Sequence, residues 1–541
     1  MTEPARRETG RPLTLAPHGM VTSPHALASE AGVAVLRAGG SAVDAAIAAN
    51  AVLSVVYPHQ SGLGGDAVGL IYDARAGRVR FLNASGRAPA AATLEEFRRR
   101  GLDEVPTRGL LPVTVPGTVA GWWAAHRAYG RLPWRSLFEP AIGYAREGVP
   151  VTGRVAAAIQ RALDVIAQEP TTAAMYLQDG EAPRPGARLV QPLLARTLEL
   201  VAEGGREAFY TGEIAREIVA FSRARGGLLA EQDFAEARSD WGEPLAATYR
   251  GVTLYEPPPP TQGVITLLML NMLEGDDIGA LPYLGPDHVH LLVEAKKIAF
   301  ADRNRHIADP AFVKVHVERL LDRAYARERR GLIRQDRATA WDEIPAGSLE
   351  GDTVYVAAVD REGNAVSLDQ SLYFFFGSGV VAGRTGVLLH NRGAYFSLDP
   401  THPNRLEPGK RPFHTLIASL AFRGERLWAV FGCMGADGQP QIHLQVYSAM
   451  IDHGLDLQEA IEAPRWLSGR FAIGDPRDLL NLEGRFSPET LTELRRRGHQ
   501  LNVWGPWHEL TGHAQGVVID PESGVRMGGA DPRSDGAAIG Y

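Results

Sequence analysis

Few residues of this chain stand in a pattern that is known to do chemistry. The sequence contains no G-x-S-x-G elbow, no H-E-x-x-H zinc helix and no G-x-x-x-x-G-K-[ST] phosphate loop. The glycine-rich stretch SGLGGD at residues 61–66 follows a predicted helix rather than a strand, which favours a tight turn over a nucleotide cradle. What remains is Gly351-Asp352-Thr353, where a helical half of the chain passes into a strand. Taken alone, this tripeptide is an ordinary turn.

Composition excludes several kinds of site and partner. The net charge is −7 over 541 residues, and Lys and Arg are scattered, so we expect no nucleic-acid partner. Cys433 is the single cysteine, which excludes an intramolecular disulfide and a multi-cysteine metal site, and we interpret it as a small buried hydrophobic residue. The first twenty residues lack a signal-peptide core, and no run reaches about 18 apolar residues. We therefore expect a cytoplasmic protein without a membrane span.

The elements that must position a site change character along the chain. A helical pattern runs from Ser23, the predicted N-cap, to Val56, and restarts after Gly39-Gly40 at Ser41, which forms a capping box with Asp44. Residues 57–117 show no clear pattern, and helical patterns then dominate to about residue 337, apart from a strand at 251–255. After Thr353 come alternating runs at 354–360, 364–375, 415–422 and 427–433, followed by helices at 442–453 and 455–461. Strands inside with helices on both outer faces predict a layered α+β fold.

Seven ordered stretches carry a resemblance to a known family. They are GGSAVDAAIAANAVLSVVYPHQSGLGG (39–65), VPGTVAGW (115–122), EPPPPTQG (256–263), DTVYVAAVDREGNAVS (352–367), FGSGVVAGRTGVLLHN (376–391), PGKRP (408–412) and ADPRSDGAAIGY (530–541). The chain resembles the γ-glutamyltransferase (γ-glutamyltranspeptidase) superfamily of N-terminal nucleophile hydrolases. The resemblance implies a four-layer αββα sandwich and a precursor that cuts itself into a large subunit, 1–352, and a small catalytic subunit, 353–541. The two would form one interlocked domain, and a homo-oligomer of the processed pair stays open.

Carried onto this sequence, the family's nucleophile falls on Thr353, with cleavage after Asp352. A hydroxyl is a weak nucleophile without a base, and a threonine at a new N-terminus brings its own α-amine, whose unperturbed pKa is about 8. Ser371 matches a hydroxyl residue that orients this amine, although a purely structural serine is an equal alternative. The paired oxyanion donors fall on Gly435 and Ala436. Alanine retains the N–H but disfavours positive φ.

The sequence departs from the family where an amino-acid head group would bind. Ser85 stands in the place of an arginine that holds the glutamyl carboxylate, Tyr395 replaces the aspartate that pairs with the α-amine, and Tyr373 replaces an asparagine. A desolvated charge left without its partner costs several kcal/mol, so we do not expect γ-glutamyl groups to bind in the usual pose.

Three candidate cations remain in the matched segments. They are Arg87, Arg392 and His414, the last beside Thr415, and an arginine fork suits a carboxylate bidentately. Surface salt bridges for the arginines and a satisfied core histidine are the alternatives. Anion receptors without an amine receptor favour a substrate that carries a carboxylate but no α-amine.

The pattern looks like the amidohydrolase branch of the superfamily, which includes oxamate amidohydrolases and cephalosporin-acylase-like enzymes. We expect hydrolysis of a small carboxylate-bearing amide such as oxamate, without metal or cofactor. The segment between Phe396 and Lys410 is short, so a lid is reduced and water is favoured as the acceptor. A γ-glutamyl hydrolase or transpeptidase acting on glutathione, and an unprocessed, inactive binding protein, are the competing hypotheses.

Overall fold

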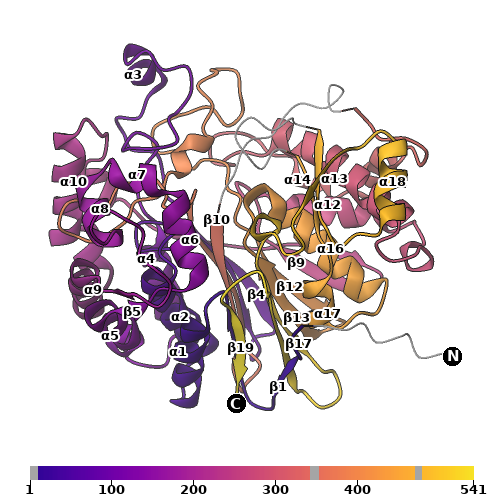
Figure 1. Ribbon diagram of the computed structural model, residues 1–541, viewed down its shortest axis with the longest axis horizontal. Helices are drawn as coiled ribbons and strands as arrows, with labels where there is room; N and C mark the ends of the chain where they lie inside the picture. The colour runs from indigo at the N-terminus through magenta and orange to yellow at the C-terminus, as the bar shows by residue number, and fades with distance from the viewer. Residues whose placement is uncertain (1–9, 341–351, 470–477) are drawn as a thin grey trace.

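Two β-sheets lie face to face in the middle of the molecule, with helices on both outer sides. The computed structural model describes residues 10–340, 352–469 and 478–541. Figure 1 shows the four layers from left to right as helices, sheet, sheet and helices. This is the αββα sandwich that the sequence predicts. Among the described residues, none of the helices combines the length and apolarity that crossing a bilayer requires.

Each main sheet has seven strands, and all neighbouring strands in both are antiparallel. One sheet has the order β19 (Ala537–Gly540), β2 (Met20–Ser23), β10 (Asp352–Val359), β11 (Ala365–Tyr373), β3 (Asp66–Asp73), β4 (Arg78–Ala84) and β7 (Asp240–Gly242). The other has the order β1 (Thr14–Ala16), β18 (Arg526–Ala530), β17 (Ala514–Ile519), β13 (Arg426–Cys433), β12 (Ala418–Arg423), β9 (Val252–Glu256) and β8 (Leu245–Tyr249). Smaller sheets are β14 (Trp466–Ser468), β15 (Leu479–Glu483) and β16 (Gln500–Trp504), and β5 (Val149–Pro150) with β6 (Arg188–Leu189). Both main sheets therefore mix strands from before and after Thr353.

The two helical layers come from different parts of the chain. The layer on β10 and β11 contains α1 (Ala26–Arg37), α2 (Ala42–Val56), α4 (Thr118–Tyr129), α5 (Glu139–Glu147), α6 (Gly153–Arg161), α7 (Leu163–Ala167), α8 (Pro170–Tyr176), α9 (Pro192–Tyr210), α10 (Glu213–Ala224) and α11 (Glu231–Ala235). The layer on β9 and β13 contains α12 (Gly263–Leu273), α13 (Pro286–His306), α14 (Val317–Leu320), α15 (Arg323–Arg330), α16 (Gln439–Ile451), α17 (Leu457–Glu462) and α18 (Pro488–Arg496). The short α3 (Leu94–Arg99) lies away from both layers (Figure 1).

Helix α2 shows why the Ala-rich segment folds as predicted. Ser41 and Asp44 form the capping box, and all fifteen residues of the helix are buried in the core beside β10 and β11. The prediction for the preceding helix was wrong by a few residues. Ser23 ends β2, which pairs with β10 and β19, and the N-cap of α1 is His25. Strand pairing thus takes precedence over the local Ser-Pro capping signal.

Strands before Thr353 are more numerous than the sequence indicates. β3 and β4 lie in the segment without a clear pattern, and β8 extends the second sheet. The first six residues of β3 are buried on both faces, so they do not alternate between apolar and polar. This strand pairs with β11 and brings Asp66 beside Ser371.

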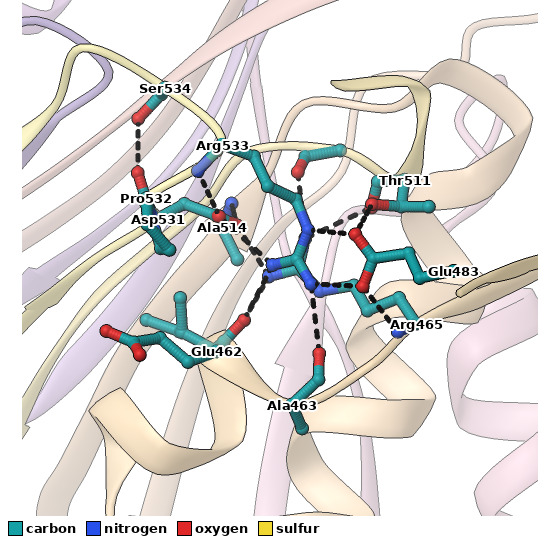
Figure 2. Close-up of polar contacts among 12 residues, drawn as sticks. Glu462, Ala463, Arg465, Glu483, Thr511, Ala514, Asp531, Pro532, Arg533 and Ser534 are labelled. Carbon is teal, nitrogen blue, oxygen red and sulfur yellow. Dashed lines mark hydrogen bonds and ion pairs between the residues drawn. The ribbon is translucent and has the colours of Figure 1, made fainter. Parts of the chain in front are cut away.

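Buried ion pairs hold residues 531–533, which follow β18, against the small sheet of β14, β15 and β16. Arg533 donates to both oxygens of Glu483, and Arg465 pairs with Asp531 at 2.5 Å, as Figure 2 shows. All four side chains are buried. The segment before β19 is therefore anchored by charges that partner one another inside the protein.

Candidate active site

Thr353 lies near the start of a buried strand in the interior of its sheet. β10 has β2 on one side and β11 on the other, and the register with β11 shifts between Asp352, opposite Tyr373, and Val354, opposite Gln370. Thr353 consequently faces two residues of β11, Ser371 and Leu372. Residues 341–351, before the predicted cleavage site, lie outside the described residues.

The alternation of β10 directs the Thr353 side chain toward the inside of the sandwich. Val354, Val356 and Ala358 pack against the first helical layer, whereas Tyr355 and Ala357 pack between the two sheets. Thr353 has the same parity as Tyr355. It is completely buried, and its hydroxyl has no hydrogen-bond partner within the described segments. A buried hydroxyl without a partner at this position is a group that folding alone does not explain.

Ser371, on the strand next to Thr353, contacts residues of the predicted substrate side. Its Oγ accepts hydrogen bonds from the Tyr373 N–H at 2.8 Å and from Arg392 Nη2 at 3.2 Å. The glycine-rich turn predicted at 61–66 packs directly on this residue, since a Cβ on Gly65 would lie 2.4 Å from the Ser371 carbonyl oxygen. The role of Ser371 in orienting the α-amine stays a prediction.

Arg392 is a fully buried cation that contacts Ser371, which faces Thr353 on the neighbouring strand. It begins the short 3₁₀ turn η4 (Arg392–Tyr395), donates to Thr415 Oγ1 at 2.8 Å, and its guanidinium lies over the Tyr373 ring, 4.2 Å from the centroid. Within the described residues it forms no ion pair with a carboxylate, and its Nε is unpartnered. Tyr373 adopts a φ of +78°, unusual for a bulky residue, where it supports this guanidinium.

For His414, the sequence left a cation and a satisfied core histidine open, and the structure favours the core histidine. Burial and the charge of Arg392 lower the pKa of His414 to about 3, so the ring is neutral at neutral pH. Its Nδ1 accepts from the Leu416 N–H and its Nε2 lies 3.1 Å from Asp66 Oδ2, which assigns the proton to Nε2. Asp66 also accepts from the Gly86 N–H at 2.8 Å. His414 is therefore an uncharged member of a buried hydrogen-bond network.

Arg87 is held away from the contacts that Arg392 makes. Its guanidinium pairs with Asp240 at 3.2 Å and donates to the Gly409 carbonyl, and its side chain is 29% exposed. Asp240 also pairs with Arg411 at 2.7 Å. This is the salt-bridge alternative that the sequence left open. Ser85, in the place of the family's arginine, bonds to Asn83 Oδ1.

The turn with the predicted oxyanion donors directly follows β13. Gly435 has a φ of +148° and Ala436 a φ of +46°, where η5 (Ala436–Gly438) begins and leads into α16. A left-handed conformation costs a non-glycine residue about 1–2 kcal/mol. Ala436 adopts it nevertheless, so surrounding contacts must stabilise this turn. That the two N–H groups face the Thr353 hydroxyl stays a prediction.

Several polar residues of the site were missed from sequence. The Asp437 carboxylate accepts from Arg303 Nη1 at 2.8 Å and from the Tyr395 hydroxyl at 2.7 Å. Gln262 donates to the carbonyls of Thr415 and Ala436. Gln262 stands in the Pro-rich stretch that carries the resemblance, and Asp66 ends SGLGGD, but a single polar residue in an apolar context gives no periodic signal.

One buried cluster within the described residues has ligand types for a metal ion. Ligand atoms of His290, Glu294 and His499 lie within 4.8 Å of one another. Glu294, however, accepts from Lys297 Nζ at 2.7 Å and from the Thr339 N–H at 2.9 Å, and His290 bonds to His499. Glu294 thus fixes the backbone at Thr339, shortly before the predicted cleavage site, and we assign no metal to the cluster.

The whole sequence and the fold were compared with those of known proteins. A family model described as gamma-glutamyltranspeptidase matches residues 28–541. The chain is 43% identical over 524 residues to the glutathione hydrolase-like YwrD proenzyme of Bacillus subtilis (strain 168), covering 96% of this chain and 98% of that protein. It is 42% identical over 536 residues to the oxamate amidohydrolase proenzyme of Klebsiella pneumoniae, covering 97% and 98%.

A solved structure agrees with these relatives over the whole chain. The crystal structure of cephalosporin acylase from Bacillus halodurans superposes with a TM-score of 0.91 at 38% identity, and the match covers 100% of this chain and 99% of that one. The fold, the position of Thr353 and the proenzyme relatives point the same way. The chain belongs to the gamma-glutamyltranspeptidase family and is an amide hydrolase of the N-terminal nucleophile fold, made as a proenzyme.

Proposed function

We propose that the processed protein hydrolyses the amide of a small substrate that carries a carboxylate and no α-amine, with oxamate as the favoured example. The observation that carries this proposal is Arg392. A fully buried guanidinium without a carboxylate partner among the described residues is costly, and an anionic substrate group would supply the missing partner. Its fork geometry suits a carboxylate.

The surroundings support this choice over an amino-acid head group. Tyr395, in the place of the family's amine-binding aspartate, donates its hydroxyl to Asp437, and that carboxylate is already paired with Arg303. Asp66 is engaged by His414 and the Gly86 N–H. Neither carboxylate is therefore left for an α-ammonium group. The oxamate amidohydrolase relative has the substrate chemistry that this pocket favours.

The reaction has two stages. In maturation, Thr353 Oγ1 attacks the Asp352 carbonyl carbon, and the acyl group moves from nitrogen to oxygen, which frees the α-amine of Thr353. Water then hydrolyses the ester to release the Thr353 hydroxyl and the Asp352 α-carboxylate. In turnover, the α-amine takes the hydroxyl proton while Oγ1 attacks the substrate amide. Gly435 and Ala436 N–H groups stabilise the developing oxyanion. The α-amine then passes this proton to the nitrogen of the leaving group, which departs as ammonia or a free amine. Water hydrolyses the acyl-enzyme and regenerates the Thr353 hydroxyl.

Side-by-side hydrolysis of oxamate, glutathione and a glutaryl amide tests the substrate. We expect kcat/KM to be highest for oxamate. Replacing Arg392 by Met should lower the oxamate value about tenfold or more, because a charge-assisted hydrogen bond contributes about 1.5–3 kcal/mol. Arg87→Met, which removes an arginine already paired with Asp240, is the matched control and should change it less. Efficient glutathione turnover that survives Arg392→Met would return the protein to the γ-glutamyl class.

A further inference from the structure

The Gln262 side chain, from the first half of the chain, hydrogen-bonds to the turn that contains Gly435 and Ala436. Gln262 is fully buried just before α12. Its Nε2 donates to the Ala436 carbonyl at 2.8 Å and to the Thr415 carbonyl at 2.8 Å, and its Oε1 accepts from Arg303 Nη1 at 2.8 Å. Both N–H donors and the carbonyl oxygen of this amide are thus used.

The rest of the turn is held around this contact. Arg303 also donates to both oxygens of Asp437, at 2.8 and 3.3 Å, and the Gly438 N–H donates to the Gly435 carbonyl at 2.6 Å. The Gly435 carbonyl and the Ala436 N–H belong to one planar peptide, so fixing the carbonyl fixes the direction of the N–H. Gln262 fixes the carbonyl on the other side of Ala436. Together these contacts maintain its left-handed conformation.

We infer that Gln262 is a positioning residue for the oxyanion turn, supplied by the large fragment to the small one. This inference rests on the proposed function in taking the Gly435 and Ala436 N–H groups as the oxyanion donors. Cleavage after Asp352 leaves Gln262 and Arg303 on one fragment and Thr415, Ala436 and Asp437 on the other. The large fragment thereby shapes a catalytic turn that it does not itself contain.

The same contact links the turn to the carboxylate receptor. Thr415 accepts from Arg392 through its side chain and from Gln262 through its carbonyl. Gln262 therefore holds the residue that orients Arg392 and the residue that offers an oxyanion N–H in one fixed relation. A substrate whose carboxylate lies next to its amide needs these two receptors at a set separation.

Gln262→Glu separates positioning from simple structural support. The variant retains the shape and an acceptor for Arg303, but an ionised carboxylate cannot donate to either carbonyl. We expect normal processing and kcat lower by about 10- to 100-fold, with KM within about threefold, since the oxyanion donors act as charge develops. Lowering the pH protonates the introduced carboxylate and restores one donor, so the ratio of variant to wild-type kcat should rise.

The matched control is Gln191→Glu, a buried glutamine that donates to the Val55 carbonyl at 2.8 Å in the first helical layer. It should leave kcat unchanged. Unchanged kcat in Gln262→Glu, or a loss confined to stability or KM, would overturn the inference. If that variant is not processed, Arg303→Lys decides, because it releases Gln262 Oε1, and an unchanged kcat there would overturn it equally.

The assay uses whichever of oxamate, glutathione and glutaryl amide the wild type hydrolyses fastest. A preference for glutathione would contradict the substrate proposal and leave the Gln262 test intact. A preference for oxamate with full activity in Gln262→Glu would contradict only the role of Gln262.

Discussion

Two groups of buried arginine side chains differ in how their charges are partnered. In the C-terminal cluster, Arg465 and Arg533 pair with Asp531 and Glu483, as Figure 2 shows. In the active site, Arg392 is equally buried but is bound only by hydroxyl groups and an aromatic ring among the described residues. A paired buried cation holds a structure together, whereas an unpaired one beside a nucleophile is suited to bind an anion.

The pKa shift of Arg533 follows the same division, whereas burial and the neighbouring charge of Arg533 lower the pKa of Arg465 although it is paired. Burial acts to lower the pKa of Arg533, but Asp531 and Glu483 outweigh it and raise that pKa above its usual value. Burial lowers the pKa of Arg392, and the nearby Tyr373 and Asp66 do not restore it. The environment of Arg533 already stabilises its charge, whereas that of Arg392 does not.

The largest expected effect is on stability in the C-terminal cluster. Glu483→Gln removes the charge that Arg533 pairs with at 2.6 Å, and breaking a buried pair costs about 3–5 kcal/mol. Denaturant unfolding of the variant in a Thr353→Ala background, which we expect to remain one chain, measures this loss. Glu243→Gln, in an exposed pair with Arg78, is the control and should cost less than about 1 kcal/mol. Equal losses in the two variants would remove the contrast.

The active-site arginine should respond in the opposite way. Arg392→Met, in the same Thr353→Ala background, should leave the free energy of unfolding within about 1 kcal/mol or raise it, because it relieves an uncompensated buried charge. With Thr353 intact, the variant should instead have a lower kcat/KM for oxamate. Thermal and denaturant unfolding provide the measurement. A loss as large as that of Glu483→Gln would show that Arg392 is structural and would contradict the comparison.

His414 gives a smaller effect that depends on pH. Its pKa is lowered to about 3 from 6.5, so below pH 6.5 the unfolded chain binds a proton that the folded state excludes. Stability is therefore lost as the pH falls, and this histidine contributes about 2 kcal/mol of that loss between pH 7 and pH 5. His414→Gln should reduce the difference between unfolding free energies at the two pH values. An identical difference would mean that His414 titrates normally.

The smallest effect concerns the left-handed turn. Ala436→Gly retains the backbone N–H and removes the Cβ penalty at a φ of +46°, so stability should rise by up to about 1 kcal/mol with kcat within about twofold. Ala46→Gly in the middle of α2 is the control, and should lower stability by about 1 kcal/mol. A loss of stability in both variants would show that Ala436 is unstrained.

Sequence reasoning recovered the first four strands of the predicted small subunit, β10 to β13, but missed β14 to β19 and most strands before Thr353. β10, β11, β12 and β13 alternate or end at glycine turns, and each was predicted within a few residues. β3 lies mostly between two packed layers and shows no alternation, so its burial became visible only with the fold. Of its two partners in the sheet, β4 is the next strand, whereas β11 lies almost three hundred residues later, a pairing that no local pattern encodes.

The active site divides in a similar way. The family motifs led to Thr353, Ser371, Arg392 and Thr415, and the structure brings these residues together. The sequence left the charge state of His414 open, because that state depends on burial and on Arg392, which are tertiary properties. Gln262 was missed because it acts through three contacts with separate elements. The division into subunits 1–352 and 353–541 and the cytoplasmic location stay predictions.

The central claim is that the catalyst is created when the chain is cut before Thr353. N-terminal sequencing and intact mass of the smaller fragment test it directly. The account predicts a fragment that begins Thr-Val-Tyr, and a Thr353→Ala protein that stays full length although it folds. A fragment that begins at another residue, or cleavage that persists in Thr353→Ala, would contradict it.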